Sequence, residues 1–239
     1  MVFTERILNL VFPKSCLVCG CSGAYCCEKC YRTFSLLKNQ DCPSCRRKNP
    51  TGVFCSFACG KDFNFEQLVV CLDYGRNALL RDLLRLFKYN FSKELAENLG
   101  RVMKWQFAPF SHNFIDAVLV PVPLHKSRLA YRGFNQAGLL AQYLAGTFSG
   151  LTLCDCLIRR ERRYEQAKLK REERLKNLDG VMELRTAYKG FLKNKVVVLV
   201  DDVATTCSTL NECSRALKNA GASYVCGLVL GRGFAKINA

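Results

Sequence analysis

Closely spaced cysteine pairs dominate the first quarter of the chain. Four pairs, each separated by two or three residues, follow one another before residue 60: Cys16 and Cys19, Cys27 and Cys30, Cys42 and Cys45, and Cys55 and Cys59. Two thiolates at this spacing can reach the same metal ion, and structural Zn2+ takes four such ligands in a tetrahedron. The eight thiolates therefore predict two structural zinc sites, with no coordination position left open for catalysis.

The pairing of these cysteines has more than one solution in the sequence. Sequential pairing builds one site from the first two pairs and another from the last two. Interleaved pairing joins the first pair to the third instead. Cys21 and Cys26 add a further ambiguity, because either could replace a neighbouring ligand. A module this short has too little core to fold alone, so the metal would supply much of its stability.

A second group of functional side chains follows the most apolar run of the sequence, residues 196–200. Asp201 and Asp202 come directly after this run, and a loop of small and hydroxylated residues then leads into a predicted helix. Free backbone N–H groups, the helix dipole and Thr and Ser hydroxyls all favour a bound phosphate at such a point. The two carboxylates are acceptors, so they suit ribose hydroxyls rather than the phosphate. An acidic cap on a surface turn is the alternative, but it does not explain paired acids on a buried strand.

The hydrophobic pattern defines the elements that position these groups. Residues 1–61 form the predicted cysteine-rich module, opened by a short helix over residues 1–13, and residues 62–239 form the predicted second domain. In the second domain, strands are expected at residues 68–74, 115–120, 153–158, 196–200 and 224–230, and helices at 77–89, 136–148 and 210–220. This alternation predicts an α/β fold with a doubly wound parallel sheet flanked by helices, and ligands bind such sheets at the carboxyl ends of the strands.

One charged segment interrupts the alternation of strands and helices. Residues 159–176 are almost wholly charged, with both signs present and an excess of basic side chains. Such a segment is either an exposed helix supported by ion pairs four residues apart or a mobile basic flap over a site. Composition alone favours the exposed helix.

The net charge of +16 and the pI near 9.3 indicate attraction to polyanions. Candidates are nucleic acid, anionic lipid and phosphorylated small molecules, and the alternative is a solvated basic surface without a dedicated partner. Ten of the sixteen cysteines lie in the first module, and the other six are scattered through apolar segments. This placement is typical of a reducing compartment. No run approaches the roughly 18 apolar residues of a membrane-spanning helix, and residues 1–13 make a poor secretory signal, so we expect a cytoplasmic protein that is not itself transmembrane.

The motifs also carry a resemblance to known families. Residues 196–210 resemble the signature with which type I phosphoribosyltransferases bind 5-phosphoribosyl 1-pyrophosphate (PRPP). Over nearly its full length the chain resembles the ComF (ComFC) family, known for roles in DNA uptake during natural transformation. The resemblance is carried by the cysteine pairs, Leu86-Phe87-Lys88-Tyr89, Pro121-Val122-Pro123, Arg132-Gly133-Phe134-Asn135-Gln136, Gln166, Glu173-Arg174, Asn177 and the Asp201-Asp202 loop. It implies a type I phosphoribosyltransferase-like sheet behind an N-terminal double zinc ribbon.

The resemblance also implies a role for individual residues. Asp201 and Asp202 would hold the ribose hydroxyls with the help of Mg2+. The 5′-phosphate would be cradled by Thr205, Thr206, Cys207, Ser208 and Thr209, and Ala204 would also belong to the PRPP-binding residues. Pyrophosphate would lie at residues 121–128, with its counter-charge supplied by Lys126, Arg128 and Arg132. Residues 159–176 would fall where these enzymes carry a mobile flap, which replaces the interpretation as a plain exposed helix.

Cys207 departs from the family pattern, because it stands where the phosphate loop has a glycine. Glycine allows the backbone to approach a phosphate closely and to adopt positive φ values. A cysteine side chain should therefore weaken phosphate binding without abolishing it, since the other amides of the loop are kept. A nucleophilic role for Cys207 lacks a histidine partner in the sequence, which contains only His112 and His125.

Three functions remain compatible with the sequence. The chain is an active phosphoribosyltransferase with an unknown acceptor, a PRPP-binding protein of DNA uptake, or a non-catalytic adaptor. We expect PRPP binding within a DNA-uptake role, with contacts to single-stranded DNA and to uptake proteins at the inner face of the membrane. The first module combines basic and aromatic side chains, Lys29, Arg32, Arg46, Arg47, Lys48, Tyr25, Tyr31 and Phe34. These aromatic rings either stack on bases or form the small core of the module.

Overall fold

A computed structural model of the chain describes residues 14–89, 94–160 and 181–233. The predicted helix over residues 1–13 and most of the charged segment 159–176 lie outside the described residues. Within the described parts of the chain, no helix is both long and apolar enough to cross a lipid bilayer.

The described residues that follow the cysteine-rich module are built on a five-stranded sheet. Its strands are, in spatial order, β3 (Gln67–Asp73), β9 (Tyr224–Arg232), β8 (Val196–Ala204), β4 (Val118–Pro121) and β5 (Thr152–Leu153). Every neighbouring pair of strands is parallel. The apolar run 196–200 occupies the centre of the sheet, as expected for a strand covered on both faces.

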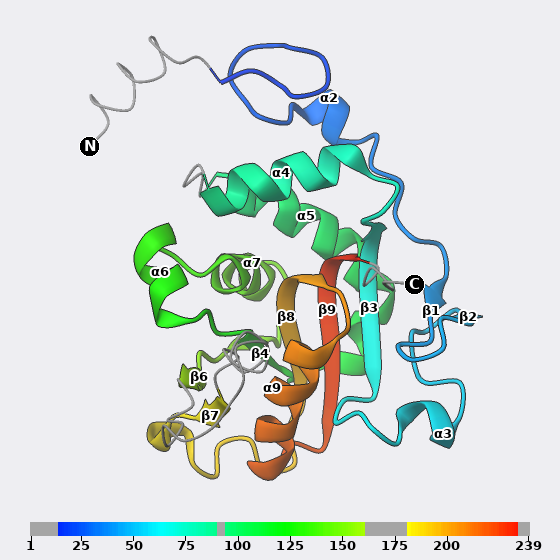
Figure 1. The fold of residues 1–239 in the computed structure, drawn as a ribbon, viewed down its shortest axis with the longest axis vertical. Coiled ribbons are helices and arrows are strands. Elements are labelled where there is room, and N and C mark those ends of the chain that lie inside the picture. The colour runs from blue at the N-terminus through cyan, green and yellow to red at the C-terminus, as the bar shows by residue number, and fades with distance from the viewer. Residues whose placement is uncertain (1–13, 90–93, 161–180, 234–239) are drawn as a thin grey trace, which may run out of the picture.

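Helices pack on both faces of this sheet (Figure 1). One face, which includes Val198 and Val200 of β8, packs against α4 (Ala78–Tyr89), α5 (Leu95–Phe107) and α7 (Gln136–Ala145). The other face, which includes Val197 and Leu199, packs mainly against α9 (Ser208–Asn219). The arrangement confirms the predicted α/β fold with a parallel sheet between helices, preceded by a cysteine-rich module.

Two predicted strands differ from the observed ones. The central strand β8 does not end at residue 200 but continues to Ala204, so the two acids belong to the strand itself. The predicted strand at residues 153–158 is two short strands, β5 and β6 (Leu157–Arg160). Strand β6 pairs antiparallel with β7 (Val181–Leu184) in a separate sheet, at the two ends of residues 161–180, which lie outside the described part. The other elements described after the cysteine-rich module are α6 (Lys126–Arg132) and two short 3-10 helices, η1 (Ala108–Phe114) and η2 (Thr186–Tyr188).

The first half of the cysteine-rich module packs against α5. Its short helix α2 (Glu28–Tyr31) places the Tyr31 ring 4.9 Å from the Trp105 ring, measured between centroids. Glu28 accepts a hydrogen bond of 3.1 Å from the guanidinium of Arg101. Because Tyr31 is only 1% exposed, it belongs to the core and is not available to stack on a nucleic-acid base.

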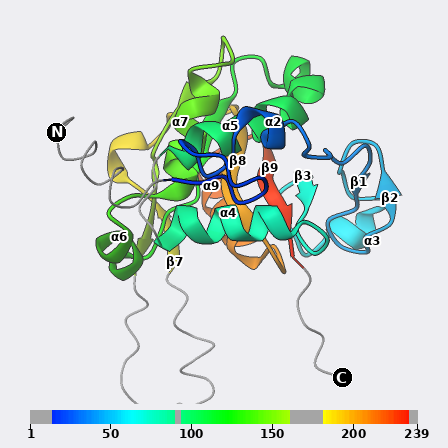
Figure 2. The same cartoon turned by 90° about the horizontal axis from the view of Figure 1, so that it is seen from above.

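The second half of the module covers the free edge of β3 (Figures 1 and 2). It consists of β1 (Gln40–Asp41), β2 (Lys48–Asn49) and α3 (Phe57–Gly60). The buried amide of Gln40 bonds both backbone groups of Val70, and the carbonyl of Gly52 accepts from the N–H of Leu68. A Cβ on Gly52 would lie 2.2 Å from the Leu68 oxygen, so only glycine allows this approach. The module thus caps an edge strand that would otherwise present unpaired backbone groups.

Candidate functional site

A cavity of about 200 Å3 lies at the carboxyl ends of β4 and β8. Its charged lining comes from four separate parts of the chain. Asp201 and Asp202 come from β8, Arg128 and Arg132 from α6, Lys88 from the end of α4, and Arg159 from β6. The parallel sheet thus places its cavity where such folds bind ligands, and it brings together acids and bases that are far apart in the sequence.

The two acids are held by local hydrogen bonds and by one ion pair. The Asp202 N–H donates to Oδ1 of Asp201 over 2.8 Å, and the Val203 N–H donates to Oδ1 of Asp202 over 2.7 Å. The Lys88 ammonium lies 2.5 Å from Oδ2 of Asp202, and the Asp202 side chain is 13% exposed. This partly desolvated pair is stronger than a surface ion pair, since water screens it less.

Desolvation changes the ionisation of Asp201. Burial, together with the negative charge of Asp202, raises the pKa of Asp201 to about 8, although the Asp202 N–H and the Lys88 ammonium act in the opposite direction. Two adjacent carboxylates in a partly dry site cannot both ionise without cost. At neutral pH the pair therefore carries less than two full negative charges, and a bound cation or hydroxyl donor would relieve the repulsion.

Helix α6 supplies the basic side of the cavity. Arg132 is 8% exposed, donates to Oε1 of Gln136 over 3.2 Å, and places its guanidinium carbon 5.5 Å from the centre of the Tyr89 ring. Arg128 also lines the cavity. Lys126 stands at the start of the helix and does not line it. The structure therefore brings two of the three predicted counter-charges to the acids.

The predicted phosphate loop joins β8 to α9. Residues 201 and 203–210 line a smaller cavity of about 40 Å3, which shares Asp201, Val203 and Thr209 with the larger one. Thr205, Thr206 and Ser208 are exposed, and the Thr206 and Ser208 hydroxyl oxygens lie 2.9 Å apart. Hydroxyls thus lie beside the N-terminus of a 12-residue helix, where backbone N–H groups and the dipole favour an anion.

Cys207 occupies the turn of this loop with a left-handed backbone. Its φ is 63°, a conformation that costs a non-glycine residue about 1 kcal/mol. The side chain is 2% exposed and is therefore packed into the protein rather than directed at solvent. Burial raises the pKa of the Cys207 thiol, although Arg232 and Arg46 oppose this. A buried thiol with a raised pKa is a poor nucleophile, so a structural role fits Cys207 better.

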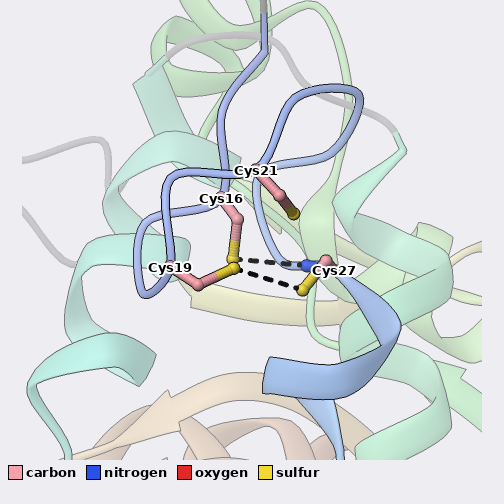
Figure 3. A group of neighbouring side chains, drawn as sticks. All are labelled: Cys16, Cys19, Cys21 and Cys27. Atoms are coloured by element: carbon pink, nitrogen blue, oxygen red, sulfur yellow. Dashed lines mark hydrogen bonds between the residues drawn. The ribbon is translucent and has the colours of Figure 1, made fainter.

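Two groups of four cysteines form candidate metal centres in the cysteine-rich module. The sulfurs of Cys42, Cys45, Cys55 and Cys59 all lie within 4.8 Å of one another, and so do those of Cys16, Cys19, Cys21 and Cys27 (Figure 3). Tetrahedral zinc with bonds of about 2.3 Å requires sulfurs about 3.8 Å apart, and two pairs lie at 3.4 Å and 3.6 Å. Both groups therefore fit a thiolate-bound metal, and both follow the sequential pairing.

The membership of the first group differs from the prediction in one residue. Cys21 lies in the group of four, whereas the predicted ligand Cys30 lies outside it. Burial, together with the neighbouring thiols of Cys19, Cys27 and Cys16, nevertheless raises the pKa of the Cys30 thiol. Five thiols thus surround a position that needs four, which is the ambiguity that the neighbouring cysteines create in the sequence.

Backbone donors prepare the first cysteine of each group for metal binding. Burial opposes ionisation of Cys16, but the N–H groups of Cys27, Cys19 and Val18 outweigh it and lower the Cys16 pKa to about 6. Burial likewise opposes ionisation of Cys42, and backbone N–H groups, that of Cys55 foremost, lower its pKa to about 6. Metals bind the thiolate, so the same local geometry at two places supports a metal-binding purpose for both.

Lys88 and Gln136 are site residues that the sequence analysis did not single out as ligands. Lys88 stands at the end of the amphipathic helix α4, and Gln136, 2% exposed, lies directly after a helix cap at Asn135. Both belong to motifs that carry the family resemblance. Their position inside those motifs was the available signal, but only the fold shows that they line the same cavity as the acids.

The raised pKa of Asp201 predicts a specific dependence of stability on pH. In the unfolded chain this carboxyl loses its proton near pH 3.8, whereas in the folded chain it keeps the proton until about pH 8. Over this range the unfolded state binds fewer protons, so the contribution of Asp201 to stability is complete below about pH 4 and is lost as the pH rises through about 8. Asp201→Asn removes this loss. Its free energy of unfolding, minus that of the wild type, should therefore rise between about pH 5 and 8.5 by more than about 1.4 kcal/mol in urea titrations.

Two further variants check the cause of this pH dependence. Lys88→Met should move the loss of stability to higher pH, because the ammonium that favours the ionised form is gone. Asp155→Asn, which removes an exposed carboxylate paired with Arg185, should leave the pH dependence unchanged. A difference between Asp201→Asn and wild type that stays constant with pH would contradict the assignment of the raised pKa to Asp201.

Comparison with known proteins adds the evolutionary context of this site. No protein-family model matches the chain. Among solved structures it is similar to a purine phosphoribosyltransferase from Pyrococcus horikoshii, with 15% identity, 58% of this chain and 88% of that chain covered, and a TM-score of 0.31. A hypoxanthine phosphoribosyltransferase from Staphylococcus aureus gives 16% identity, coverages of 62% and 71%, and a TM-score of 0.33. Both scores are too low to bear on the function of this chain.

Curated relatives match over most of their own length. Competence protein F of Haemophilus influenzae is 27% identical over 217 residues, covering 83% of this chain and 93% of the relative. Competence protein ComFC of Bacillus subtilis is 29% identical over 233 residues, with coverages of 86% and 89%. DNA utilization protein YhgH of Escherichia coli is 28% identical over 203 residues, with coverages of 83% and 85%. These relatives confirm the resemblance of the chain to the ComF family.

Proposed function

We propose that this chain binds PRPP, or a closely related ribose phosphate, at the carboxyl end of β8. The observation that carries the proposal is the junction of two cavities at Asp201 and Thr209. One cavity holds a carboxylate pair that can accept from ribose hydroxyls, and the other is lined by hydroxyls at a helix N-terminus that can hold a 5′-phosphate. One ligand that carries both groups would fill both cavities.

The far side of the larger cavity suits the pyrophosphate of such a ligand. Arg128 and Arg132 line it together with the acids, and guanidinium groups bind phosphate oxygens with paired donors. Lys126, on the same helix but outside the cavity lining, would contribute long-range attraction only. If pyrophosphate leaves C1 of the ribose, the same two arginines would stabilise the charge that develops on it.

Mg2+ belongs to this proposal as a partner of the carboxylates. The fit rests on the donor set, since Mg2+ binds through one or two carboxylates and the phosphates of the substrate. When bound, the ion would neutralise phosphate charge. The chain's own residues do the rest: Asp201 and Asp202 orient the ribose, and Lys88 balances the charge of Asp202 until a ligand or cation takes that place.

We further propose that both cysteine groups hold Zn2+ and that the protein acts in the cytoplasm in DNA uptake or utilization. Four thiolates in a closed group are typical of structural zinc. All sixteen cysteines are free thiols, which suits a reducing compartment. The names of the competence and DNA-utilization relatives support the role, and contacts with DNA-uptake proteins at the inner face of the membrane would follow from it.

Contact with single-stranded DNA is a second candidate function, which the exposed charge of the cysteine-rich module favours. Lys29, Arg32, Arg47 and Lys48 are exposed, and the whole chain carries a net charge of +16. Tyr31 is buried and Phe34 packs edge-on against it, so these two rings are not available for base stacking, and the exposed basic side chains would contact phosphates. We therefore propose a salt-sensitive, sequence-tolerant contact.

Isothermal titration calorimetry, with PRPP and Mg2+ titrated into the zinc-loaded protein, tests whether the chain binds this ligand. We expect saturable one-to-one binding by the wild type and a decrease of at least about tenfold in affinity for Asp201→Asn/Asp202→Asn, since each charged hydrogen bond contributes about 1.5 kcal/mol or more. The matched control Asp82→Asn/Glu97→Gln removes the same charge at two exposed acids of α4 and α5 and should bind as the wild type does. Equal affinity in all three proteins would place the ligand elsewhere, and absence of heat in all three would refute the proposal.

Fluorescence anisotropy with a labelled single-stranded oligonucleotide tests the DNA contact. Replacing Lys29, Arg32, Arg47 and Lys48 by Gln should weaken binding and flatten the plot of log affinity against log salt. The slope should fall by about 0.7 for each DNA phosphate that the variant no longer neutralises. Gln replacement of the exposed Arg76 and Arg85, outside the module, serves as the control for reduced net charge. An unchanged slope in the fourfold variant would show that DNA binds to another surface.

A further inference from the structure

The second cysteine group lies against the end of the strand next to the phosphate loop. Arg232 is the last residue of β9, and in the sheet it stands beside Ala204, the last residue of β8. Its side chain is buried, with 8% of the residue exposed. One nitrogen, Nη1, donates to the carbonyl of Cys42 over 3.5 Å, and Nη2 donates to the carbonyl of Pro43. Residues 42–45, which we call the knuckle, carry the first two cysteines of this group. The backbone of the knuckle therefore accepts hydrogen bonds from a buried guanidinium.

The same guanidinium reaches the phosphate loop. In the sheet Arg232 pairs with Ala204, and its positive charge acts on the thiol of Cys207, which stands in the left-handed turn of the loop. Arg232 also keeps one buried nitrogen, Nε, without a hydrogen-bond partner among the described residues. A buried charge that is not fully satisfied depends strongly on the acceptors that it does have. Removal of the two knuckle carbonyls would therefore destabilise the position of Arg232 and, with it, its interaction with Cys207.

Arg46 provides a parallel connection from the same knuckle. Its backbone N–H donates to the carbonyl of Cys42 over 3.1 Å, and its guanidinium donates to the carbonyl of Gly233 over 3.3 Å. The N–H of Gly233 in turn donates to the carbonyl of Ala204 over 2.8 Å, directly before the loop. Both Arg232 and Arg46 thus connect the backbone of the knuckle to Ala204, at the start of the phosphate loop.

The first cysteine group is anchored on a different part of the fold. Its helix α2 contacts α5 through Glu28 and Arg101 and through Tyr31 and Trp105. Both groups fit a metal equally well, but of the two only the second has its backbone bonded by Arg232. The chain therefore contains its own matched control for any effect of metal on the loop.

We propose that Arg232 is a positioning residue that couples the second cysteine group to the phosphate loop, so that metal bound by Cys42, Cys45, Cys55 and Cys59 holds residues 204–209 in their binding conformation. A metal fixes the knuckle and so fixes the two carbonyls that hold the guanidinium. Arg232 then holds the end of β8 at Ala204, directly before the loop in which Cys207 adopts a backbone conformation that is unfavourable for cysteine. Because coupling between sites is reciprocal, ordering of the loop also slows release of metal from this group. The consequence for ligand affinity rests on the proposed ribose-phosphate site, but the coupling itself does not.

Hydrogen–deuterium exchange on the full, zinc-loaded chain without ligand tests the coupling. Arg232→Met and Cys45→Ser should speed exchange of the amides of residues 204–209 at least about fivefold. The matched variants Arg101→Met and Cys19→Ser, which act on the first group, should leave these amides as they are in the wild type. Exchange in β4 and α7 reports in each protein whether the sheet is intact. Arg232→Lys, which keeps the charge but not the forked donor, should fall between wild type and Arg232→Met.

Zinc release keeps the proposal testable if Cys45→Ser does not fold. Transfer of zinc to a chromogenic chelator should show two phases in the wild type, and Arg232→Met should speed one of them at least about fivefold while Arg101→Met does not. Unchanged exchange at residues 204–209 in Arg232→Met, or unchanged zinc release, would overturn the coupling. PRPP titration separates the two proposals: coupling without PRPP binding refutes only the ligand, whereas PRPP binding with an uncoupled loop refutes only the role of Arg232.

Discussion

The carboxylates of Asp201 and Asp202, placed at the end of a strand buried on both faces, are the constraint on which the site depends. Adjacent acids in a partly dry position repel each other, and burial together with this repulsion raises the pKa of Asp201 to about 8. The fold compensates by bringing bases from elsewhere, Lys88 from the end of α4 and Arg132 from α6. Helices α4 and α6 are therefore as much part of the site as the strand that carries the acids. The proposed ligand, a ribose with phosphates and a cation, would complete this balance of charge.

The cysteine-rich module contributes to the same arrangement through the edge of the sheet. Its second half satisfies the open edge of β3 through Gln40 and Gly52, and its knuckle accepts from Arg232 at the end of β9. A small module without a large core gains stability from metal, and we propose that a metal in the second cysteine group would also fix the carbonyls of Cys42 and Pro43 that accept from Arg232. The module and the sheet thus share structure close to the phosphate loop, which is why the second cysteine group is the one expected to influence ligand binding.

Much of the fold could be predicted from local pattern, because strong patterns have few structural solutions. The apolar run 196–200 could only be a central strand, and the amphipathic spacing of α4 and the cysteine pairs were equally specific. The continuation of β8 to Ala204 was not predicted, since acids are poor strand formers and only pairing with β9 holds them extended. The place of Cys21 in the first group was not predicted either, because five thiols offer more than one set of four and three-dimensional proximity decides among them. Long-range contacts such as Lys88 with Asp202 and Arg232 with Cys42 leave no periodic signal, so only the fold shows them.

The central claim is that one ligand spans the two cavities at Asp201 and Thr209. The measurement that tests it most directly is a crystal structure of the full chain grown with PRPP and Mg2+. We predict electron density with the 5′-phosphate at residues 205–209, the ribose hydroxyls within hydrogen-bond distance of Asp201 and Asp202, and the pyrophosphate facing Arg128 and Arg132. Density for PRPP at another surface, or empty cavities at a concentration that saturates binding in solution, would contradict it.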